Sequence, residues 1–355
     1  MSFFSEKYNN FRTPDLSIYL NGKEINSKEM NISDIEVDLI RNGSGSFRFV
    51  VSGAVGKDFI PKFEQELNFG NFVEIALGYQ NKKEPVIKGF ISSVRYIFKE
   101  KNFLDIEVEG YDYLFLLSKN RPIRSWNKQK ISEIVEFITQ NYPIKNKQIQ
   151  DSSIKFDYIR QSGKSDLQFL RYLSQKAGYE FFMINDTFYF REPPFGKSAD
   201  FSLEFGVDIM DLEISLDISP VFNRLTVLGW DFKRKKGFKS EINSGDEPLI
   251  NPDGVSGTQT VSRDLKTELT VQLESQAAVY EEAETVGKSL FYSRSLDFAD
   301  LTCRAVGIPD IKPSSVLSIQ KIGDRFSKSY FVERVIHRFS DAGFNTLIKL
   351  KGNVV

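Results

Sequence analysis

The chain has 355 residues, of which 41% are hydrophobic, 27% are charged and 14% are aromatic. This length predicts two to three domains with a core each, and the near balance of 47 basic and 48 acidic residues argues against a polyanion-binding surface over the whole chain. The first residues lack an apolar signal-peptide core, and no apolar run reaches the roughly 18 residues of a membrane helix. We therefore expect no membrane span and folding in the cytoplasm.

The first third of the chain reads as β-structure. Residues 1–12 are polar and aromatic without a period and are predicted to form an N-terminal arm. Asp15–Leu20 alternates between polar and apolar residues and meets Asn21-Gly22, a strong hairpin signal. Further alternating runs continue to Gly110. These patterns predict an antiparallel β-barrel over residues 13–118.

The middle of the chain changes to helical spacing. Apolar residues recur every three to four positions after Ile131 and again from Asp166 to Gly178, where Ser165 is placed to cap the second helix and Gly178 to end it. A hairpin around Asn185-Asp186 follows. Residues 119–206 are predicted to form a small α+β domain.

The remaining residues return to alternation, with an interruption. Residues 207–230 and 296–355 are predicted to form a second β-barrel, and 231–295 an insertion that contains a helix. The basic cluster Lys233–Lys236 in this insertion is interpreted as a solvated loop tip, with nucleic-acid contact as the alternative, and no specific nucleic-acid site is expected.

The two predicted barrels repeat one another. The pattern around Phe90, Val94 and Tyr96 or Phe98 recurs around Phe331, Val335 and His337 or Phe339. Upstream, Ile32–Leu39 followed by Phe47–Val51 matches Ile209–Leu216 followed by Phe222–Leu228. The predicted fold class is α+β and mainly β, with two duplicated, tube-like antiparallel β-barrels joined by a small α+β domain.

The sequence offers no catalytic constellation. His337 is the only histidine, and its place in an alternating run favours a structural or interface role; Cys303, the only cysteine, is interpreted as a buried small side chain. Gly-Lys-Ser occurs at Gly163, Gly196 and Gly287 without the earlier glycine of a phosphate loop, and scattered acidic pairs such as Glu180 with Asp186 identify no glycosidase. We expect no catalytic, cofactor-binding or metal site and no enzyme activity.

The middle segment carries a family resemblance. It contains Arg121–Trp126, Ile131–Phe137 and Tyr142, then Gln161 with Ser165-Asp166 leading into Phe169-Leu170 and Leu173, and lastly Gly178-Tyr-Glu-Phe-Phe182. The C-terminal run has Val306–Pro313, Tyr330–Val332, Val335–His337 and Gly343–Thr346. In this order the chain resembles the late-control protein D family of contractile-tailed phages and the N-terminal hub part of VgrG proteins.

The resemblance implies a baseplate hub of a phage tail, tailocin or contractile injection system. It implies a homotrimeric, pseudo-sixfold ring that adapts a hexameric tail tube to a trimeric spike. The implied partners are the tail tube protein, a spike, other baseplate proteins and the tape measure. The spike is expected on a separate chain, because this one stops at Val355 before any needle. The implied location is the bacterial cytoplasm during assembly and then the baseplate.

Loops and edge strands of both barrels are hypothesised to contact the tube or neighbouring subunits. The residues proposed for these contacts are Gly43, Ser44, Ser46, Pro220 and Asn223. Two other classes stay open as alternatives. One is a β-rich receptor- or glycan-binding tail component, and the other is a cell-wall hydrolase, which the missing catalytic set disfavours.

Overall fold

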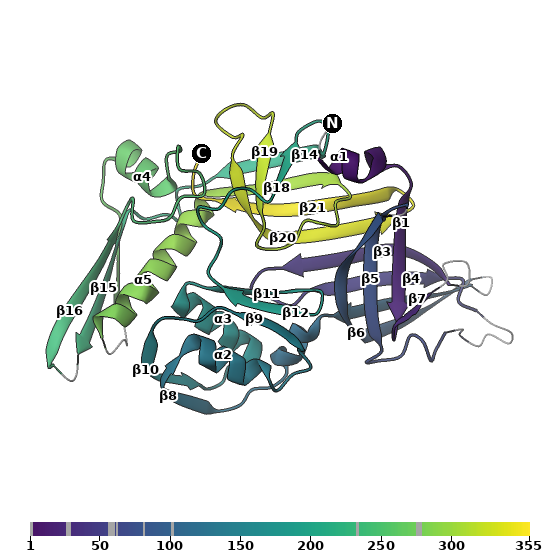
Figure 1. The fold of residues 1–355 in the computed structure, drawn as a ribbon, viewed down its shortest axis with the longest axis horizontal. Helices are drawn as coiled ribbons and strands as arrows, with labels where there is room; N and C mark the ends of the chain where they lie inside the picture. The colour runs from purple at the N-terminus through teal and green to yellow at the C-terminus, as the bar shows by residue number, and fades with distance from the viewer. Residues whose placement is uncertain are drawn as a thin grey trace.

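The structure is a computed structural model that describes residues 3–25, 30–55, 61, 63–80, 82–100, 103–231, 234–274 and 279–355. Strands dominate these residues, which confirms the predicted mainly-β class. Most strands belong to one 13-stranded sheet, and three smaller sheets accompany it. Figure 1 shows the main sheet at the top and right, the middle domain beneath it, and a smaller sheet with helix α5 projecting to one side.

The N-terminal half of the main sheet is built from consecutive antiparallel strands. They are β1 (Pro14–Leu20), β2 (Lys23–Glu24), β3 (Asn31–Ile40), β4 (Ser46–Ser52), β5 (Phe72–Tyr79), β6 (Lys82–Lys99) and β7 (Phe103–Tyr111). Their order in the sheet is β3-β4-β7-β6-β5-β1-β2. Asn21 and Gly22 turn β1 into β2 with φ of 50° and 83°, which confirms the predicted hairpin.

The C-terminal half repeats this order. Its strands are β13 (Phe201–Glu204), β14 (Ile209–Leu216), β18 (Ala299–Val306), β19 (Val316–Gln320), β20 (Ser329–Ser340) and β21 (Gly343–Gly352). The series β14-β18-β21-β20-β19 corresponds to β3-β4-β7-β6-β5. β6 and β20 even carry a bulge at matching positions, after Ile91 and after Val332.

One strand of the predicted repeat is placed elsewhere. Phe222–Leu228 was expected beside β14, but this segment enters β15 (Arg224–Asp231), which pairs with β16 and β17 in a separate sheet. β18 takes the expected position, with Leu301 and Cys303 buried. Both segments mix polar and apolar residues as strands do, and a strand pattern does not state which strand lies beside it.

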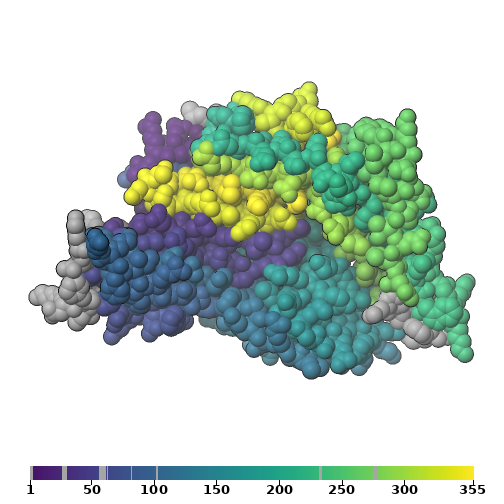
Figure 2. Space-filling model, turned by 180° about the vertical axis from the view of Figure 1, so that it is seen from behind, coloured from purple at the N-terminus to yellow at the C-terminus, as the bar shows by residue number. Residues whose placement is uncertain are grey.

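The two halves join where β20 pairs with β3, and one buried core cluster contains side chains from both. Figure 2 shows the yellow C-terminal strands lying directly against the purple N-terminal strands. Among the described residues, no ladder joins β2 to β3 or β13 to β14. Strand pairing alone therefore does not divide this sheet into two closed barrels.

The middle domain has its own apolar core. It comprises η3 (Tyr113–Ser118), β8 (Arg124–Lys130), α2 (Ile131–Thr139), β9 (Asn146–Ile149), β10 (Lys155–Gln161), α3 (Asp166–Ala177), β11 (Glu180–Ile184) and β12 (Thr187–Arg191). Helix α3 begins and ends as predicted, because Ser165 Oγ accepts from Gln168 N (3.2 Å) and Gly178 has a φ of 73°.

The described residues of the predicted insertion, 231–295, fold into a projecting unit together with β15 and η4 (Leu296–Phe298), which were predicted to belong to the second barrel. Its other elements are β16 (Lys236–Asn243), α4 (Gly257–Leu265), β17 (Thr270–Glu274) and α5 (Tyr280–Ser295). Helix α5 covers one face of the three-stranded sheet β16-β15-β17 through Ala283 and Phe291. Lys233 of the basic cluster and residues 275–278 of the predicted helix lie outside the described residues. None of the described helices has the length and apolarity needed to cross a membrane.

The N-terminal arm packs against the sheet rather than extending from it. Helix α1 (Phe3–Lys7) and the 3-10 turn η1 (Asn9–Phe11) place Phe4 and Tyr8 in the main core. The Tyr8 hydroxyl donates to Asp310 (2.5 Å), and Lys7 Nζ lies 2.9 Å from Glu84, so the arm contacts both halves. Its aromatic residues had no period from which this packing could be predicted.

Candidate functional site

The joint between β20 and β3 pairs residues 334–339 with residues 35–40. On one face, Arg338 Nε donates to Glu36 (2.8 Å) and Arg334 Nε donates to Asp38 (2.8 Å). On the other face, His337 lies directly opposite Val37, and both are fully buried. Exposed ion pairs contribute little stability, so the buried face supplies most of the attraction between the halves.

His337 is the polar centre of this buried face. Its Nδ1 lies 3.0 Å from Thr346 Oγ1, and the same hydroxyl accepts a hydrogen bond from Ile308 N (3.0 Å). Burial, with a smaller effect of the Lys312 charge, lowers the pKa of His337 to about 3. The imidazole is therefore neutral at physiological pH and packs within the sheet, in agreement with the structural role predicted for it.

A buried carboxylate fixes the middle domain to the joint. Glu180, the first residue of β11, lies 3.5 Å from Arg41 Nη1, just after β3, and 3.5 Å from Arg191 Nε on β12. It also accepts a hydrogen bond from the hydroxyl of Ser314 in the C-terminal half. Burial raises the pKa of Glu180, and Arg41 is the strongest opposing influence. This one side chain contacts all three parts of the chain.

This role of Glu180 was not predicted from the sequence, in which Glu180 and Asp186 were considered only as a possible glycosidase pair. The available signal was a lone charge at the start of a strand that continues with Phe181 and Phe182, both fully buried. A carboxylate in such a strand needs partners of opposite charge, because an unpaired buried charge is costly.

The predicted contact residues Gly43, Ser44 and Ser46 lie around the turn between β3 and β4. Gly43 is buried, Ser44 Oγ donates to Asp112 (2.7 Å), and Ser46 is opposite Tyr111 in the ladder. The turn also contacts the middle domain, since Asn42 N donates to the Phe181 carbonyl (2.7 Å). These residues already have partners inside the chain, and their contact with the tube or a neighbouring subunit stays a prediction.

Asp112 makes this turn sensitive to pH. It accepts from Ser44 Oγ (2.7 Å), Gly45 N (2.7 Å) and Leu114 N (2.9 Å), and burial nevertheless raises its pKa to about 6. Because the folded pKa lies above that of the unfolded chain, protonation of Asp112 favours folding, and this stability is lost as pH rises through 6.

We expect Asp112→Asn to remove this dependence. The difference in unfolding free energy between the natural chain and the Asp112→Asn variant should shift by about 2 kcal/mol against the natural chain between pH 4 and pH 7. Chemical denaturation at several pH values measures it. A constant difference over this range would contradict the assigned titration.

The other predicted contact residues, Pro220 and Asn223, lie just before β15. Asn223 is buried; its Nδ2 donates to Ser262 Oγ and to the Thr267 carbonyl (2.9 Å each), and its Oδ1 accepts from Leu269 N (2.8 Å). Pro220 is half-buried. Pro220 and Asn223 do not lie with the Gly43–Ser46 turn. Asn223 instead holds segments of the insertion together through these hydrogen bonds. Contact of either residue with the tube or a neighbouring subunit stays a prediction.

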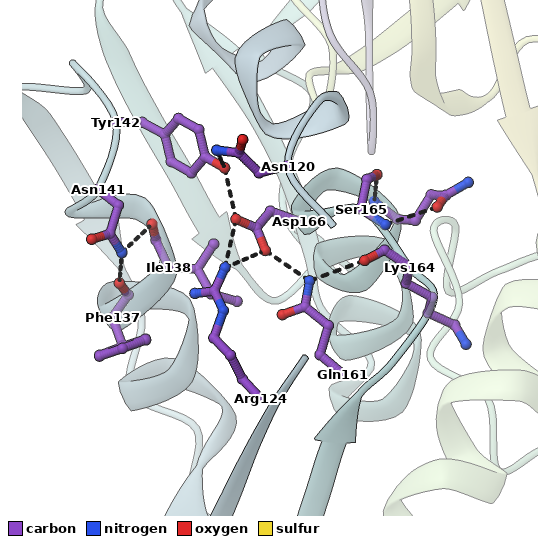
Figure 3. A network of polar contacts seen from close by, with 11 residues as sticks. Asn120, Arg124, Phe137, Ile138, Asn141, Tyr142, Gln161, Lys164, Ser165 and Asp166 are labelled. Atoms are coloured by element: carbon purple, nitrogen blue, oxygen red, sulfur yellow. Dashed lines mark hydrogen bonds and ion pairs between the residues drawn. The ribbon is translucent and has the colours of Figure 1, made fainter. Parts of the chain in front are cut away.

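The residues that carry the family resemblance meet around Asp166 (Figure 3). The Asp166 carboxylate accepts two hydrogen bonds from Arg124 Nη2 (2.7 and 2.8 Å), one from Gln161 Nε2 (2.7 Å) and one from the Tyr142 hydroxyl (2.6 Å). Burial and the bond to Asp166 raise the pKa of Tyr142 to about 12. The network ties β8, the loop after α2, β10 and α3 together, so the motif organises the middle domain.

The chemistry available elsewhere is limited. Among the described residues, no three His, Cys, Asp or Glu side chains are grouped to hold a metal ion. Cys303 is buried, which raises the pKa of its thiol to about 12. A cavity of about 570 Å³ lies between the middle domain and α5, and its described lining holds one carboxylate, Glu192, and one amine, Lys288. It lacks the pair of carboxylates on which most glycosidases depend.

Comparison with family models assigns the chain to a known family. A family model described as the Alg8 N-terminal domain matches residues 11–341, almost the whole chain. The chain belongs to the Alg8 N-terminal domain family. No curated protein matches the sequence.

Solved structures show which fold this Alg8 N-terminal domain has. The 43 kDa tail protein of prophage MuSo2 from Shewanella oneidensis matches at 15% identity and a TM-score of 0.70, over 95% of this chain and 98% of that one. The tail protein of Neisseria meningitidis MC58 matches at 16% identity and a TM-score of 0.70, over 96% and 97%. A chain of the Francisella PdpA-VgrG complex matches at 10% identity and a TM-score of 0.59, over 96% and 58%. The resemblance to tail and VgrG proteins is thus confirmed at the level of the fold.

Proposed function

We propose that this protein is the baseplate hub of a contractile tail or contractile injection system, in the manner of late-control protein D and the N-terminal part of VgrG. The observation that supports this is the repeated strand order, β3-β4-β7-β6-β5 and β14-β18-β21-β20-β19, joined edge to edge by β20 and β3. In this proposal, one chain carries two similar, tube-like units side by side.

This arrangement suits a symmetry adaptor. Three copies provide six similar units, which can meet a hexameric tail tube on one side while keeping the threefold symmetry that a trimeric spike needs on the other. The proposed partners are two further copies of the chain, the tail tube protein, the spike, other baseplate proteins and the tape measure. We propose a structural role without enzyme activity, with assembly in the bacterial cytoplasm and a final place in the baseplate.

The test is the mass of the purified chain in solution, by light scattering at several concentrations, with negative-stain images of the same samples. We expect particles of about three times 40.8 kDa with a central hole. If the chain is a monomer alone, the tail tube and spike proteins are added and the measurement is repeated. A chain that stays monomeric with both partners present contradicts the hub and favours a β-rich receptor- or glycan-binding tail component.

A further inference from the structure

Among the described strands of the main sheet, β6 and β14 each have an edge without a neighbour that corresponds to a covered edge in the other half. In β20, residues 334–339 pair with β21 on one side and with β3 on the other. The matching stretch of β6, residues 93–98, pairs with β7 on one side, and no described strand covers its second edge. The alignment rests on sequence and on the shared bulge that precedes both stretches.

The open edge of β6 leaves aromatic side chains in solvent. Tyr96 is opposite Ile106 and Phe98 is opposite Leu104, so both project toward the core side of the sheet, where these two partners are fully buried. Tyr96 is nevertheless 39% exposed and Phe98 65% exposed, whereas His337, which matches Tyr96, is fully buried at the joint. This difference in exposure is expected if Tyr96 and Phe98 lack the neighbouring strand that covers His337.

The complementary open edge is β14, which corresponds to β3. β3 is covered on both sides, and its apolar residues Ile35, Val37 and Leu39 are buried. β14 pairs with β18 alone among the described strands. Its matching residues are only partly buried against the core; they are Leu212, Ile214 and Leu216. Both open edges thus expose apolar positions that the joint between the halves covers.

Among the described strands, these two edges are not paired with each other within the chain. β14 begins the series β14-β18-β21-β20-β3-β4-β7-β6, and the open stretch of β6 ends it. Two different edges that complement each other give a head-to-tail contact between copies, and such a contact closes into a ring when the rotation allows it. Open, partly apolar edges of this kind are otherwise prone to uncontrolled pairing.

We propose that β6 of one copy pairs antiparallel with β14 of the next copy, in the register of the β20–β3 joint. This proposal rests on the proposed function and specifies the surface through which the hub assembles. Because Val335, His337 and Phe339 are opposite Leu39, Val37 and Ile35, the same register places Val94 opposite Leu216, Tyr96 opposite Ile214, and Phe98 opposite Leu212 of the next copy. Tyr96 and Phe98 then become buried.

The charges on the other face agree with this register. At the joint, Arg338 meets Glu36 directly and Arg334 reaches Asp38 on the diagonal. Arg95 lies 3.4 Å from Glu107 within the chain, and its side chain is 70% exposed. In the proposed register it would also lie diagonally from Glu213 of the next copy, an exposed residue of β14. Diagonal neighbours on one face are within reach of long side chains, so opposite charges there favour the pairing.

The first experiment is a cysteine cross-link in the full chain with Cys303 replaced by serine. Paired Cα atoms about 4.5–5.5 Å apart are within disulfide reach, so Tyr96→Cys combined with Ile214→Cys should give covalent dimers and trimers under mild oxidation. The control combines Tyr96→Cys with Glu213→Cys, which moves one thiol to the opposite face and should not cross-link.

Light scattering of the same samples separates the two proposals. Trimers that do not cross-link, or that cross-link equally well in the control, overturn the β6–β14 pairing and leave the hub intact. Samples that stay monomeric even with tube and spike proteins overturn both. Cross-linking of the Tyr96 and Ile214 pair alone supports both.

A second variant tests the same edge without cysteines. Phe98→Asp puts a charge into the proposed interface and should raise the concentration needed for trimer assembly about tenfold or more. Phe69→Asp is the matched control, because Phe69 is 67% exposed and lies outside both edges. Equal assembly of the two variants would overturn the pairing.

Discussion

Replacing Asp166 by alanine is expected to lower the free energy of unfolding of the middle domain by about 3 kcal/mol. Asp166 is 1% exposed and accepts four hydrogen bonds, from Arg124, Gln161 and Tyr142. Without the carboxylate, the Gln161 amide and the Arg124 guanidinium lose their acceptor. This loss of unfolding free energy is near the lower end of the range for removing one partner of a buried ion pair, because the Arg124 side chain is 21% exposed and keeps some hydration.

Trp126 provides the measurement, because it is buried in the middle domain and stacks on Phe169 at 5.4 Å. Its fluorescence follows urea unfolding in a Trp230→Phe background, which removes the exposed second tryptophan. Asp166→Asn should lose less, since it keeps an acceptor oxygen. The control Asp253→Ala changes an exposed carboxylate and should stay within about 0.5 kcal/mol. An Asp166→Ala loss as small as the control's would contradict the network.

Replacing Gly89 by alanine should destabilise the main sheet by about 3 kcal/mol, the upper end of the cost of overpacking. Gly89 lies in β6 where this strand leaves β5 to pair with β7. A Cβ atom there would lie 2.1 Å from the carbonyl oxygen of Tyr111 and 2.7 Å from its carbon. These are backbone atoms held in the β6–β7 ladder, so they cannot move aside as a side chain can.

Gly237→Ala in β16 is the matched control. The nearest atom to its new Cβ is in the Trp230 ring, at 3.7 Å, an ordinary contact. A glycine inside a strand is itself unfavourable, so this variant should be neutral or slightly stabilising. Denaturant unfolding compares the two. Equal stability of both variants would show that β6 and β7 do not approach each other as closely as the structure has them.

Much of the local structure followed from the sequence because its determinants lie close together in the chain. The Asn21-Gly22 turn needs two residues that accept positive φ, and helix α3 needs the hydroxyl of Ser165 before it and Gly178 after it. The match between β6 and β20 was visible because alternation and the aromatic positions recur within one strand. The motif around Asp166 was recognised by its resemblance to a known family, and the hydrogen bonds among its residues were not predicted.

The tertiary structure decided which segments became neighbours. Alternation of polar and apolar residues predicts which side chains of a strand are buried, but not which strand lies beside it. In the structure β18 lies next to β14, whereas β15 pairs in another sheet. The joint of β20 with β3, the contacts of Glu180 with Arg41 and Arg191, and the packing of Phe4 and Tyr8 all link residues far apart in the chain. Local sequence was enough to predict most strands and helices and the match between β6 and β20, but not the place of β15. Which edges were covered and which stayed open was decided by tertiary packing, because the burial of an edge depends on all the elements that compete for it.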